Sequence, residues 1–486
     1  MAAIITNKFR INNAEQFVES FSESAPTAYY LFIGRPQAWS TDVDVQGNSI
    51  NEGTDTTPPT PNDDISTEYY SYDELLGAKK ITSSDITNVI QRRTWTTGTT
   101  YDMYEHNISS SNAAAGGATN IFDSNFYVIN SANNVYKVIE NDGATTSTVE
   151  PTATSTAIFS TADGYRWKYM YSLTTSEATN FTTTDFIPVS TDSTVSAAAV
   201  DGALDTILVV AGGSGYTLSS GTTITSIPIR GDGSGGVASV TISGGAISAA
   251  TVTTAGTGYT YAYIRNADII AGTNAAGGGS GGNLNVIIPP KGGHGKDAVK
   301  ELGGFFVMMN IDLSGAEGTS DILAANDFRQ IGVVRDPTNF GTTTVASAST
   351  LRGVNAILMN SSPTPGTFVV DEKITQATTG AVGKVVSWDS TNRILYYIQT
   401  RFPDCGADTN GNRTAFSGTN VVTGATSSAT ATPIASSSTV NAVVFTSGYS
   451  NPEIEPDSGD IIYLENRAPI ARAADQTENI KLIIEF

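Results

Sequence analysis

Cysteine and histidine are almost absent from this sequence of 486 residues. Cys405 is the single cysteine, so a disulfide within the chain is impossible and a cysteine metal cluster is excluded. The two histidines, His106 and His294, are nearly 190 positions apart, and neither has a histidine or cysteine at ligand spacing. His294 stands in a Gly-Gly-His-Gly stretch that we interpret as a linker. The sequence therefore predicts no catalytic residue, no metal site and no cofactor.

Charged residues are also scarce, at 15%, and basic residues are the scarcer kind: 26 Lys and Arg stand against 47 Asp and Glu, for a net charge of −21. Nucleic-acid binding needs clustered basic side chains that replace phosphate counterions, so it is not expected, and neither is binding to an anionic membrane surface. No run approaches the roughly 18 apolar residues of a membrane span. The first residues lack the long apolar core of a signal peptide, so we expect none.

Small polar residues are abundant in this sequence, where charged residues are few. Apolar residues make up 39% of the chain, and much of the remainder is Ser, Thr, Gly and Asn. This composition is typical of all-β proteins with short strands and polar turns, and the length suggests two to four domains. We predict a mainly β protein with a multi-domain, β-sandwich-like body and few short helices.

The last residues carry a clear strand pattern. Ile461–Leu464 and Ile480–Phe486 are apolar runs, and the second alternates, with Ile480, Leu482, Ile484 and Phe486 on one face. We expect both runs to be inner strands of the body. Between them we expect a polar loop that contains Asn466, Arg467 and Pro469.

The first residues suggest a strand, a helix and a second strand. Ala3–Phe9 is predicted to be a strand, Asn13 to cap a short helix together with Gln16, and Tyr29–Ile33 to be the next strand. The polar stretch Thr41–Asp64 that follows is predicted to be a surface loop.

Two stretches contain internal repeats. VVAGGSGYT at 209–217 returns as VTTAGTGYT at 252–260, an offset of 43, and a hairpin is expected between the copies over Val237–Ile247. Phe368–Ala381 aligns with Phe416–Ala429 at an offset of 48, and a second hairpin is expected over Ala381–Gln399. Each repeat predicts a β unit that buries its face against its copy.

Four motifs stand out in the sequence. The C-terminal one is Y-x-E-N-R-x-P-I from Tyr463, followed by D-Q-T-E-x-I from Asp475. The others are V-I-x-R-R-x-W from Val89, D-G-Y-x-W-x-Y from Asp163 and F-R-Q-I from Phe328. Together they resemble the motifs of one family, the baseplate wedge subunits of T-even-type contractile-tailed bacteriophages.

The resemblance implies a non-enzymatic structural protein of the virion tail baseplate, assembled in the host cytoplasm. It implies a homodimer that contacts other wedge proteins. The resemblance places the body in residues 1–195, 291–339 and 450–486, and the segments 196–290 and 340–449 lie outside it as two inserted Gly/Ser/Thr-rich β modules.

Two polar clusters are the candidate interface residues: Arg92 and Arg93 with Trp95, and Glu465, Asn466 and Arg467. Their arginines either form surface salt bridges of about 0–1 kcal/mol or make planar, bidentate pairs that fix a subunit contact. The sequence leaves both interpretations open.

Other motifs are weaker. Gly212–Gly215 and Gly231–Gly236 lack the lysine and helix of a phosphate-binding loop, so turn glycines are expected. Asp408, Asn410 and Asn412 have calcium-loop spacing but lack the later Gly and Glu, so a hairpin turn is expected, with a weak cation site left open.

Two other functions remain as alternatives. The Gly-rich insertions are compatible with a tail adhesin that binds host surface glycans, with Tyr216 and Tyr259 stacking on sugars. A polysaccharide-degrading enzyme is the third, and no visible carboxylate pair supports it.

Overall fold

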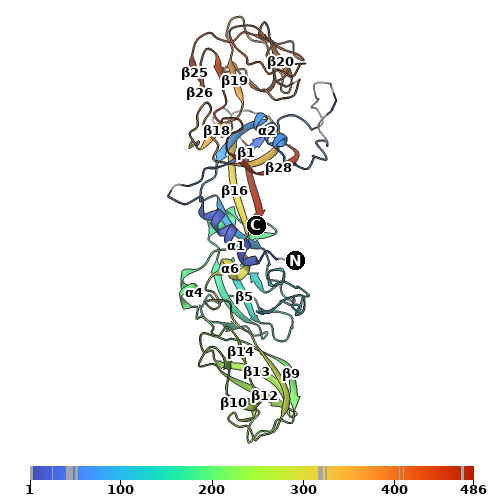
Figure 1. The fold of residues 1–486 in the computed structure, drawn as a ribbon, viewed down its shortest axis with the longest axis vertical. Helices are drawn as coiled ribbons and strands as arrows, with labels where there is room; N and C mark the ends of the chain where they lie inside the picture. Colours follow the sequence, from blue (N-terminus) through green and yellow to red (C-terminus); the bar gives the residue numbers. More distant parts are fainter. Residues whose placement is uncertain are drawn as a thin grey trace. The chain divides into compact units, whose positions relative to one another are not determined.

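The computed structural model describes residues 4–24, 26–39, 48–49, 53–315, 321–322, 326–403, 405–408, 410–471 and 476–486. Its elements are mostly strands with a few short helices, which confirms the predicted mainly β, multi-domain fold (Figure 1). The chain divides into two compact units. Unit 1 comprises Met1–Phe17, Thr87–Met308 and Ile483–Phe486, and unit 2 comprises Val18–Ile86 and Met309–Leu482.

Unit 1 holds most of the helices. Its elements are η1 (Ile121–Asp123), β4 (Tyr127–Ile129), β5 (Asn134–Glu140), β6 (Phe159–Ser160), β7 (Arg166–Ser172), α3 (Thr175–Asn180), β8 (Phe186–Pro188), α4 (Ser193–Ala198), β9 (Ile207–Ser214), β10 (Thr223–Pro228), β11 (Arg230–Gly231), β12 (Val237–Ser243), β13 (Ala246–Thr254), β14 (Ala262–Tyr263), α5 (Asn266–Ile270), β15 (Ser280–Val286) and α6 (Ala298–Leu302). Four elements cross the boundary between the units, namely α1 (Asn7–Glu19), β3 (Ile86–Gln91), β16 (Phe306–Gly315) and β29 (Gln476–Glu485). The three strands belong to one sheet of order β29-β16-β3-β8.

Unit 2 has three sheets of its own, of five, seven and two strands, and one described helix that lies wholly within it. Its elements are β1 (Tyr29–Gly34), α2 (Ile65–Asp73), β2 (Leu75–Lys80), β17 (Phe328–Arg335), β18 (Thr350–Arg352), β19 (Asn355–Leu358), β20 (Lys373–Gln376), β21 (Val382–Asp389), β22 (Ile394–Ile398), β23 (Val422–Gly424), β24 (Thr430–Ala431), β25 (Ser438–Val440), β26 (Val443–Phe445), β27 (Tyr449–Ser450) and β28 (Asp460–Ile470).

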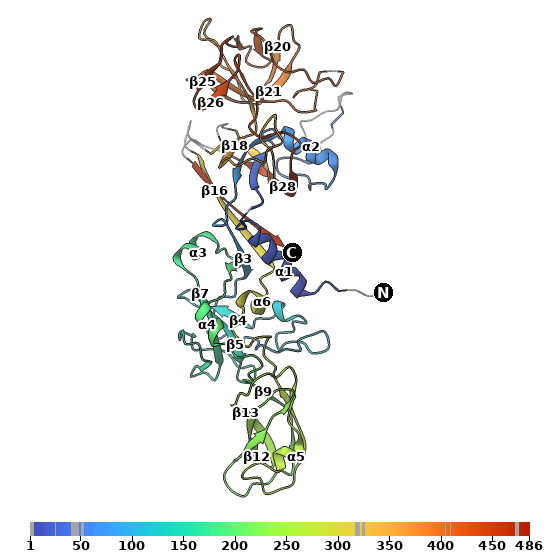
Figure 2. The same cartoon turned by 60° about the vertical axis from the view of Figure 1, so that its left-hand side comes forward.

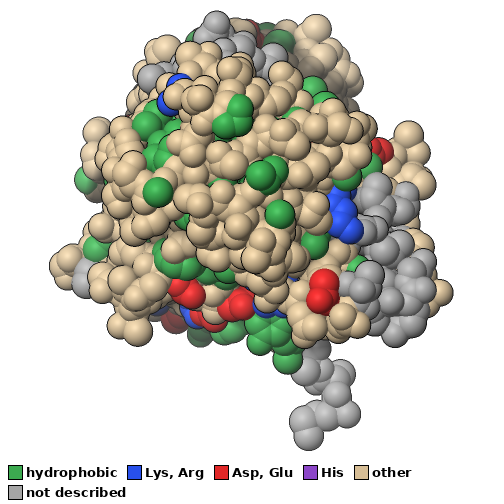
Figure 3. Space-filling view, turned by 90° about the horizontal axis from the view of Figure 1, so that it is seen from above, with side chains coloured by type: hydrophobic (Ala, Val, Ile, Leu, Met, Phe, Trp, Pro, Cys, Tyr) green, Lys and Arg blue, Asp and Glu red, His purple; other side chains and the backbone are tan. Residues whose placement is uncertain are grey.

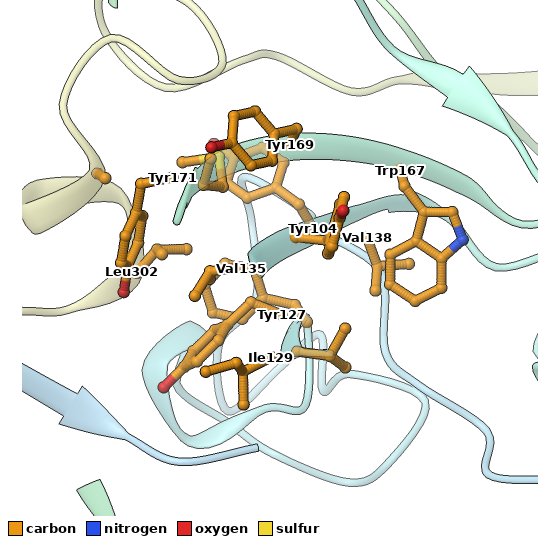
Figure 4. Packing of buried hydrophobic residues seen from close by; sticks show 14 of the residues in the cluster. Tyr104, Tyr127, Ile129, Val135, Val138, Trp167, Tyr169, Tyr171 and Leu302 are labelled. Atoms are coloured by element: carbon orange, nitrogen blue, oxygen red, sulfur yellow. The ribbon is translucent and has the colours of Figure 1, made fainter. Parts of the chain in front are cut away.

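The main core of unit 1 surrounds the sheet β4-β5-β7-β6, whose central strands lie side by side in Figure 2. Its side chains are mostly aromatic: Trp167 and Tyr136 are fully buried, and Tyr127 and Tyr171 point into the same cluster (Figure 4). Trp167, from the D-G-Y-x-W-x-Y motif, is one of its fully buried rings. Large rings provide most of the buried area, so this cluster organises the unit.

Residues 204–286 have a hydrophobic cluster of their own, around the sheet β10-β12-β13 and the pair β15-β9. The predicted hairpin over Val237–Ile247 is confirmed: β12 pairs with β13 through a turn at Gly244 and Gly245, which have φ of 62° and 79°. Such left-handed angles cost glycine nothing and strain other residues.

The five-stranded sheet of unit 2 has the order β18-β2-β1-β17-β28. The predicted strand at Tyr29–Ile33 is confirmed as β1, and the F-R-Q-I motif from Phe328 lies in β17. All six residues of β1 and all but the last of β17 are buried. Strand β28, in contrast, lies at the sheet edge and has no buried residue. One outer edge of this sheet is therefore its most accessible part.

The second sheet of unit 2 contains the second repeat. Strands β20 and β23 pair antiparallel, and Thr375 lies opposite Thr423, its own counterpart at an offset of 48. Phe368 and Phe416 are buried in one cluster, together with Ala381 and Ala429. The predicted hairpin is confirmed as β21 and β22. The outside seen in Figure 3 consists mostly of uncharged polar groups with scattered hydrophobic side chains.

The predicted N-terminal strand is wrong. Residues from Asn7 onward are helical, and the Thr6 hydroxyl caps α1 by accepting from the Phe9 amide at 3.3 Å, a role that we had assigned to Asn13. Ile11 and Ala14, three positions apart, are the buried face of this helix. Ala3 lies outside the described residues, as do 41–47 and 50–52 of the predicted surface loop.

The C-terminal prediction is partly wrong. Asn466, Arg467 and Pro469 are not in a loop, because β28 continues to Ile470. Both β28 and β29 end their sheets in the strand order, so neither is an inner strand. The predicted alternation does hold at Ile480 and Leu482, which are buried, whereas Ile484 and Phe486 are half-buried. The domain boundaries drawn from the sequence stay a prediction.

Candidate interaction surfaces and a buried ionic cluster

The first candidate cluster follows strand β3 in unit 1. Arg93 donates to the carbonyls of Phe122, at 2.9 Å, and Ser124, and its guanidinium lies 4.7 Å from the centre of the Tyr127 ring. Trp95 donates from its indole to the Ser147 hydroxyl at 3.1 Å. These two side chains therefore fix the loop around η1 and the neighbouring turn.

Arg92 is the exposed member of this cluster. It donates to the Thr183 carbonyl at 3.0 Å, and its own amide donates to the Asp185 carbonyl at 2.7 Å. Because the acceptor of its guanidinium group is a neutral carbonyl, the positive charge of Arg92 stays exposed at the surface. A rigid, exposed arginine is suited to bidentate contact with a carboxylate.

The second candidate cluster lies on β28 in unit 2. Arg467 pairs with Glu465 at 3.1 Å, and Glu465 also accepts from the Tyr463 hydroxyl at 2.9 Å. Burial, followed by the nearby Glu465 carboxylate, raises the pKa of Tyr463 to about 12. Asn466 accepts from Gln330 at 2.9 Å and donates to the Pro59 carbonyl at 3.0 Å. Asn466 is thus a positioning residue, and Arg467 stays half-exposed.

A groove separates the outer side of β28 from the segment 57–68. Its lining includes Ile461, Ile462, Tyr463 and Leu464 on the strand, and Pro61 and Ile65 opposite. Ile462 is the extra residue of a β-bulge, because Val333 pairs with Tyr463 and Val334 with Ile461. A bulge changes the direction of a side chain and disrupts the strand edge. Ile462 is 40% exposed.

The groove continues toward a buried ion pair and has an acidic rim. Arg35 and Glu74 pair at 2.6 Å with side chains only 2% and 4% exposed, and both line a neighbouring pocket that shares Pro61, Asn62 and Thr67 with the groove. Asp63, Asp64 and Glu68 line the part beside Ile462. Apolar strand residues with acidic residues around them favour a partner segment that is apolar and basic.

A different group of titratable side chains is buried in unit 1. Lys137 in β5 forms an ion pair with Glu301 in α6, with side chains 0% and 3% exposed. Glu301 also accepts from the amides of Gly295, at 2.8 Å, and Asp297, at 3.2 Å. Burial lowers the pKa of Lys137 despite the carboxylate beside it. The ion pair therefore ties α6, which follows residues 204–286 in the chain, to strand β5 of the sheet.

His294 belongs to this buried cluster, and its Gly-Gly-His-Gly stretch lies in the connection between β15 and α6. Its ring lies edge-on to Tyr104 at 5.0 Å, and its Nε2 is 3.9 Å from Asp205, too far for a hydrogen bond. Burial lowers the pKa of His294 well below its usual value, and Lys137, Lys168 and Arg166 contribute in the same direction. The neutral imidazole therefore packs inside a cluster of buried ionisable side chains.

The stability of unit 1 should fall on mild acidification because of His294. The folded protein keeps the ring neutral, while the unfolded chain binds a proton near pH 6.5, so each unit of pH below that value costs about 1.4 kcal/mol. Asp205, whose pKa is raised by burial, contributes with the opposite sign. Thermal melts of the wild type and His294→Asn between pH 7 and 5 should show the steeper decline for the wild type. Equal slopes would contradict this role.

The other sequence motifs are turns or core. Asp408 accepts from the amides of Asn410, at 2.8 Å, and Asn412, at 2.9 Å, which confirms the predicted hairpin turn. Tyr216 and Tyr259 are each 3% exposed, so neither can stack on a sugar. Gly212 lies in β9, and a Cβ there would meet the Ile247 carbonyl at 2.6 Å. Its role is a close backbone approach.

In the described part of the chain, no group of three or more His, Cys, Asp or Glu residues could hold a metal ion. No helix there is long and apolar enough to cross a membrane.

One family model matches part of the chain. The model of the family Phage-Gp8, described as Bacteriophage T4, Gp8, matches residues 3–141 and 411–486. The match supports a structural component of a T4-type phage baseplate. It includes both candidate clusters and strands β28 and β29, and leaves out residues 142–410. No curated protein matches the chain.

Proposed function

We propose that this chain is a structural subunit of the baseplate wedge of a contractile phage tail. It forms a homodimer, contacts neighbouring wedge proteins and turns over no substrate. It is assembled in the host cytoplasm and resides in the virion. The observation that carries this proposal is the family match, which spans the two ends of the chain and the exposed edge of the five-stranded sheet.

The contacts are made by the two candidate clusters. Arg92 and Arg467 present exposed guanidinium groups, and Glu465 orients Arg467. Arg93, Trp95 and Asn466 hold these groups in place through bonds inside their own units. The groove beside β28 receives an apolar, basic segment of a neighbouring wedge protein, as its acidic rim favours.

Replacing Ile462 with glutamate should exclude this chain from wedges. The side chain is half-exposed in the groove, so the protein should fold, but a new charge among Asp63, Asp64 and Glu68 repels a partner that needs an apolar contact. We expect at least a roughly tenfold loss of incorporation, equivalent to about 1.4 kcal/mol. The matched control is Val444→Glu in β26, where the valine is 66% exposed and outside the groove.

Incorporation is measured by mass spectrometry of purified tails after complementation with each variant, and cryo-electron microscopy of the virion locates the chain. Light scattering of the isolated protein should give about twice the 50.7 kDa of one chain. Density for this chain outside the baseplate would contradict the proposed function. Equal incorporation of the Ile462→Glu and Val444→Glu variants would contradict the role of the groove.

A further inference from the structure

Four side chains form an exposed aromatic and cationic patch on residues 204–286. Strands β11 and β14 pair so that Arg230 lies opposite Tyr263. Along 261–265 exposure alternates: Tyr261, Tyr263 and Arg265 are exposed, while Ala262 and Ile264 pack against the core. Arg230, Tyr261, Tyr263 and Arg265 are called the Tyr-Arg platform below. The two rings are 56% and 47% exposed.

Asp268 fixes both arginines of the platform. Arg230 binds its carboxylate at 2.8 and 3.2 Å, and Arg265 at 2.8 and 3.0 Å, each through Nε and Nη2. The two guanidinium groups hold the pKa of this carboxyl far below its usual range. The arginine side chains stay 43% and 53% exposed. The platform is therefore preorganised, and less entropy is lost when a ligand binds.

The placement of these arginines is selective. Within residues 196–290 they are the only Lys or Arg, and both lie at this one place. Both arginines share the one Asp268 carboxylate, so each guanidinium group keeps further N–H donors beside the two exposed rings. Asp232, two residues from Arg230, is engaged by the Thr260 and Tyr261 amides at 2.9 and 3.2 Å.

The chemistry of the platform suits an acidic sugar chain. Tyr263 in β14 and Tyr261, two positions before it, are both exposed, and the faces of such aromatic rings can stack on sugar units. Guanidinium groups bind carboxylates through paired hydrogen bonds. We propose that the Tyr-Arg platform binds a polysaccharide that carries carboxylate groups, such as one built from uronic acids.

The size of the patch favours a sugar over a protein. A stable protein interface buries about 800 Å² on each partner around an apolar centre. The large hydrophobic side chains exposed on the described residues 196–290 are Val200, Val210 and the two tyrosines. Two rings and two arginines are enough for a short stretch of sugar. This inference is independent of the baseplate assignment, since residues 142–410 lie outside the family match.

The test is calorimetry of the full chain with oligogalacturonate, a neutral maltooligosaccharide and an acidic oligoglutamate peptide. We expect binding to oligogalacturonate alone. Tyr261→Ala and Tyr263→Ala should each weaken it roughly fivefold, equivalent to about 1 kcal/mol. Arg265→Lys should weaken it too, because lysine lacks the bidentate edge. Val210→Ala, at an exposed valine outside the platform, should leave it unchanged.

Three results would overturn the proposal: no oligogalacturonate binding, equal binding of the neutral sugar, or binding that none of the platform variants weakens. Binding of oligoglutamate alone, lost in the same variants, would assign the platform to an acidic protein partner instead. Each variant is first compared with the wild type by thermal melting. Tyr261 and Tyr263 are exposed, so a platform variant that binds weakly but melts normally isolates the ligand contact.

Discussion

Replacing Lys137 with methionine is expected to destabilise unit 1 by about 3–5 kcal/mol, because it leaves the Glu301 carboxylate charged and buried without its cation. The pair is almost inaccessible to solvent, with side chains 0% and 3% exposed. Glu301 would keep only the amides of Gly295 and Asp297 as donors. Urea denaturation measures the loss of stability, and hydrogen exchange shows whether it falls in unit 1. The expected change is a large part of the free energy of unfolding of a typical domain.

Two further variants separate charge burial from packing. Lys137→Met combined with Glu301→Gln removes both charges, while the amide oxygen still accepts from the two backbone groups, so most of the stability should return. Lys300→Met, on the same helix, removes a cation that is 57% exposed and paired with Asp297 at 2.7 Å. It should cost no more than about 1 kcal/mol. A double variant as unstable as Lys137→Met would mean that shape, and not charge, decides the loss.

Local patterns in the sequence predicted strands but not their neighbours. Alternation located the hairpin of β12 and β13 and the buried face of Ile480 and Leu482, because period-two burial is a property of the strand itself. Whether a strand is inner or outer depends on which strands pair with it, and β28 meets β17 across more than a hundred residues. The polar Asn466 and Arg467 suggested a loop, although edge strands tolerate polar residues well.

The candidate sites depend on long-range contacts even more than the order of the strands does. Arg93 and Asn466 were predicted as interface residues and prove to be occupied by carbonyl and amide partners inside their units. Lys137 and Glu301 are far apart in sequence, and the available signal was a lysine in the middle of an apolar strand. The Tyr-Arg platform was visible as alternating Tyr261, Tyr263 and Arg265. The GYT repeat, in contrast, directed attention to the buried tyrosines.

The GYT repeat corresponds to a packing unit that occurs twice in the structure. Tyr216 packs on Gly279 and Gly282, where an added Cβ would meet the ring or hydroxyl at 2.3–2.4 Å, and the Gly282 amide donates to its hydroxyl at 3.1 Å. Tyr259 packs in the same way on Gly233 and Gly236, and the Gly236 amide donates to its hydroxyl at 3.1 Å. Each tyrosine thus rests on a Gly-Ser-Gly-Gly segment, and the two copies of this unit share one core.

Truncating either tyrosine to alanine should therefore lower the free energy of unfolding by about 3–5 kcal/mol and unfold residues 204–286 first. The lost ring leaves a cavity, and the glycines around it have no side chains that could fill it. Tyr→Phe at the same positions should cost about 1–3 kcal/mol, since a buried glycine amide loses its acceptor. Tyr261→Ala, in the same segment but 56% exposed, is the control and should stay within about 0.5 kcal/mol. Hydrogen exchange by mass spectrometry reports these losses segment by segment. If Tyr216→Ala and Tyr259→Ala differed widely in cost, the two copies would not be equivalent halves of one core, and the repeat would reflect only sequence duplication.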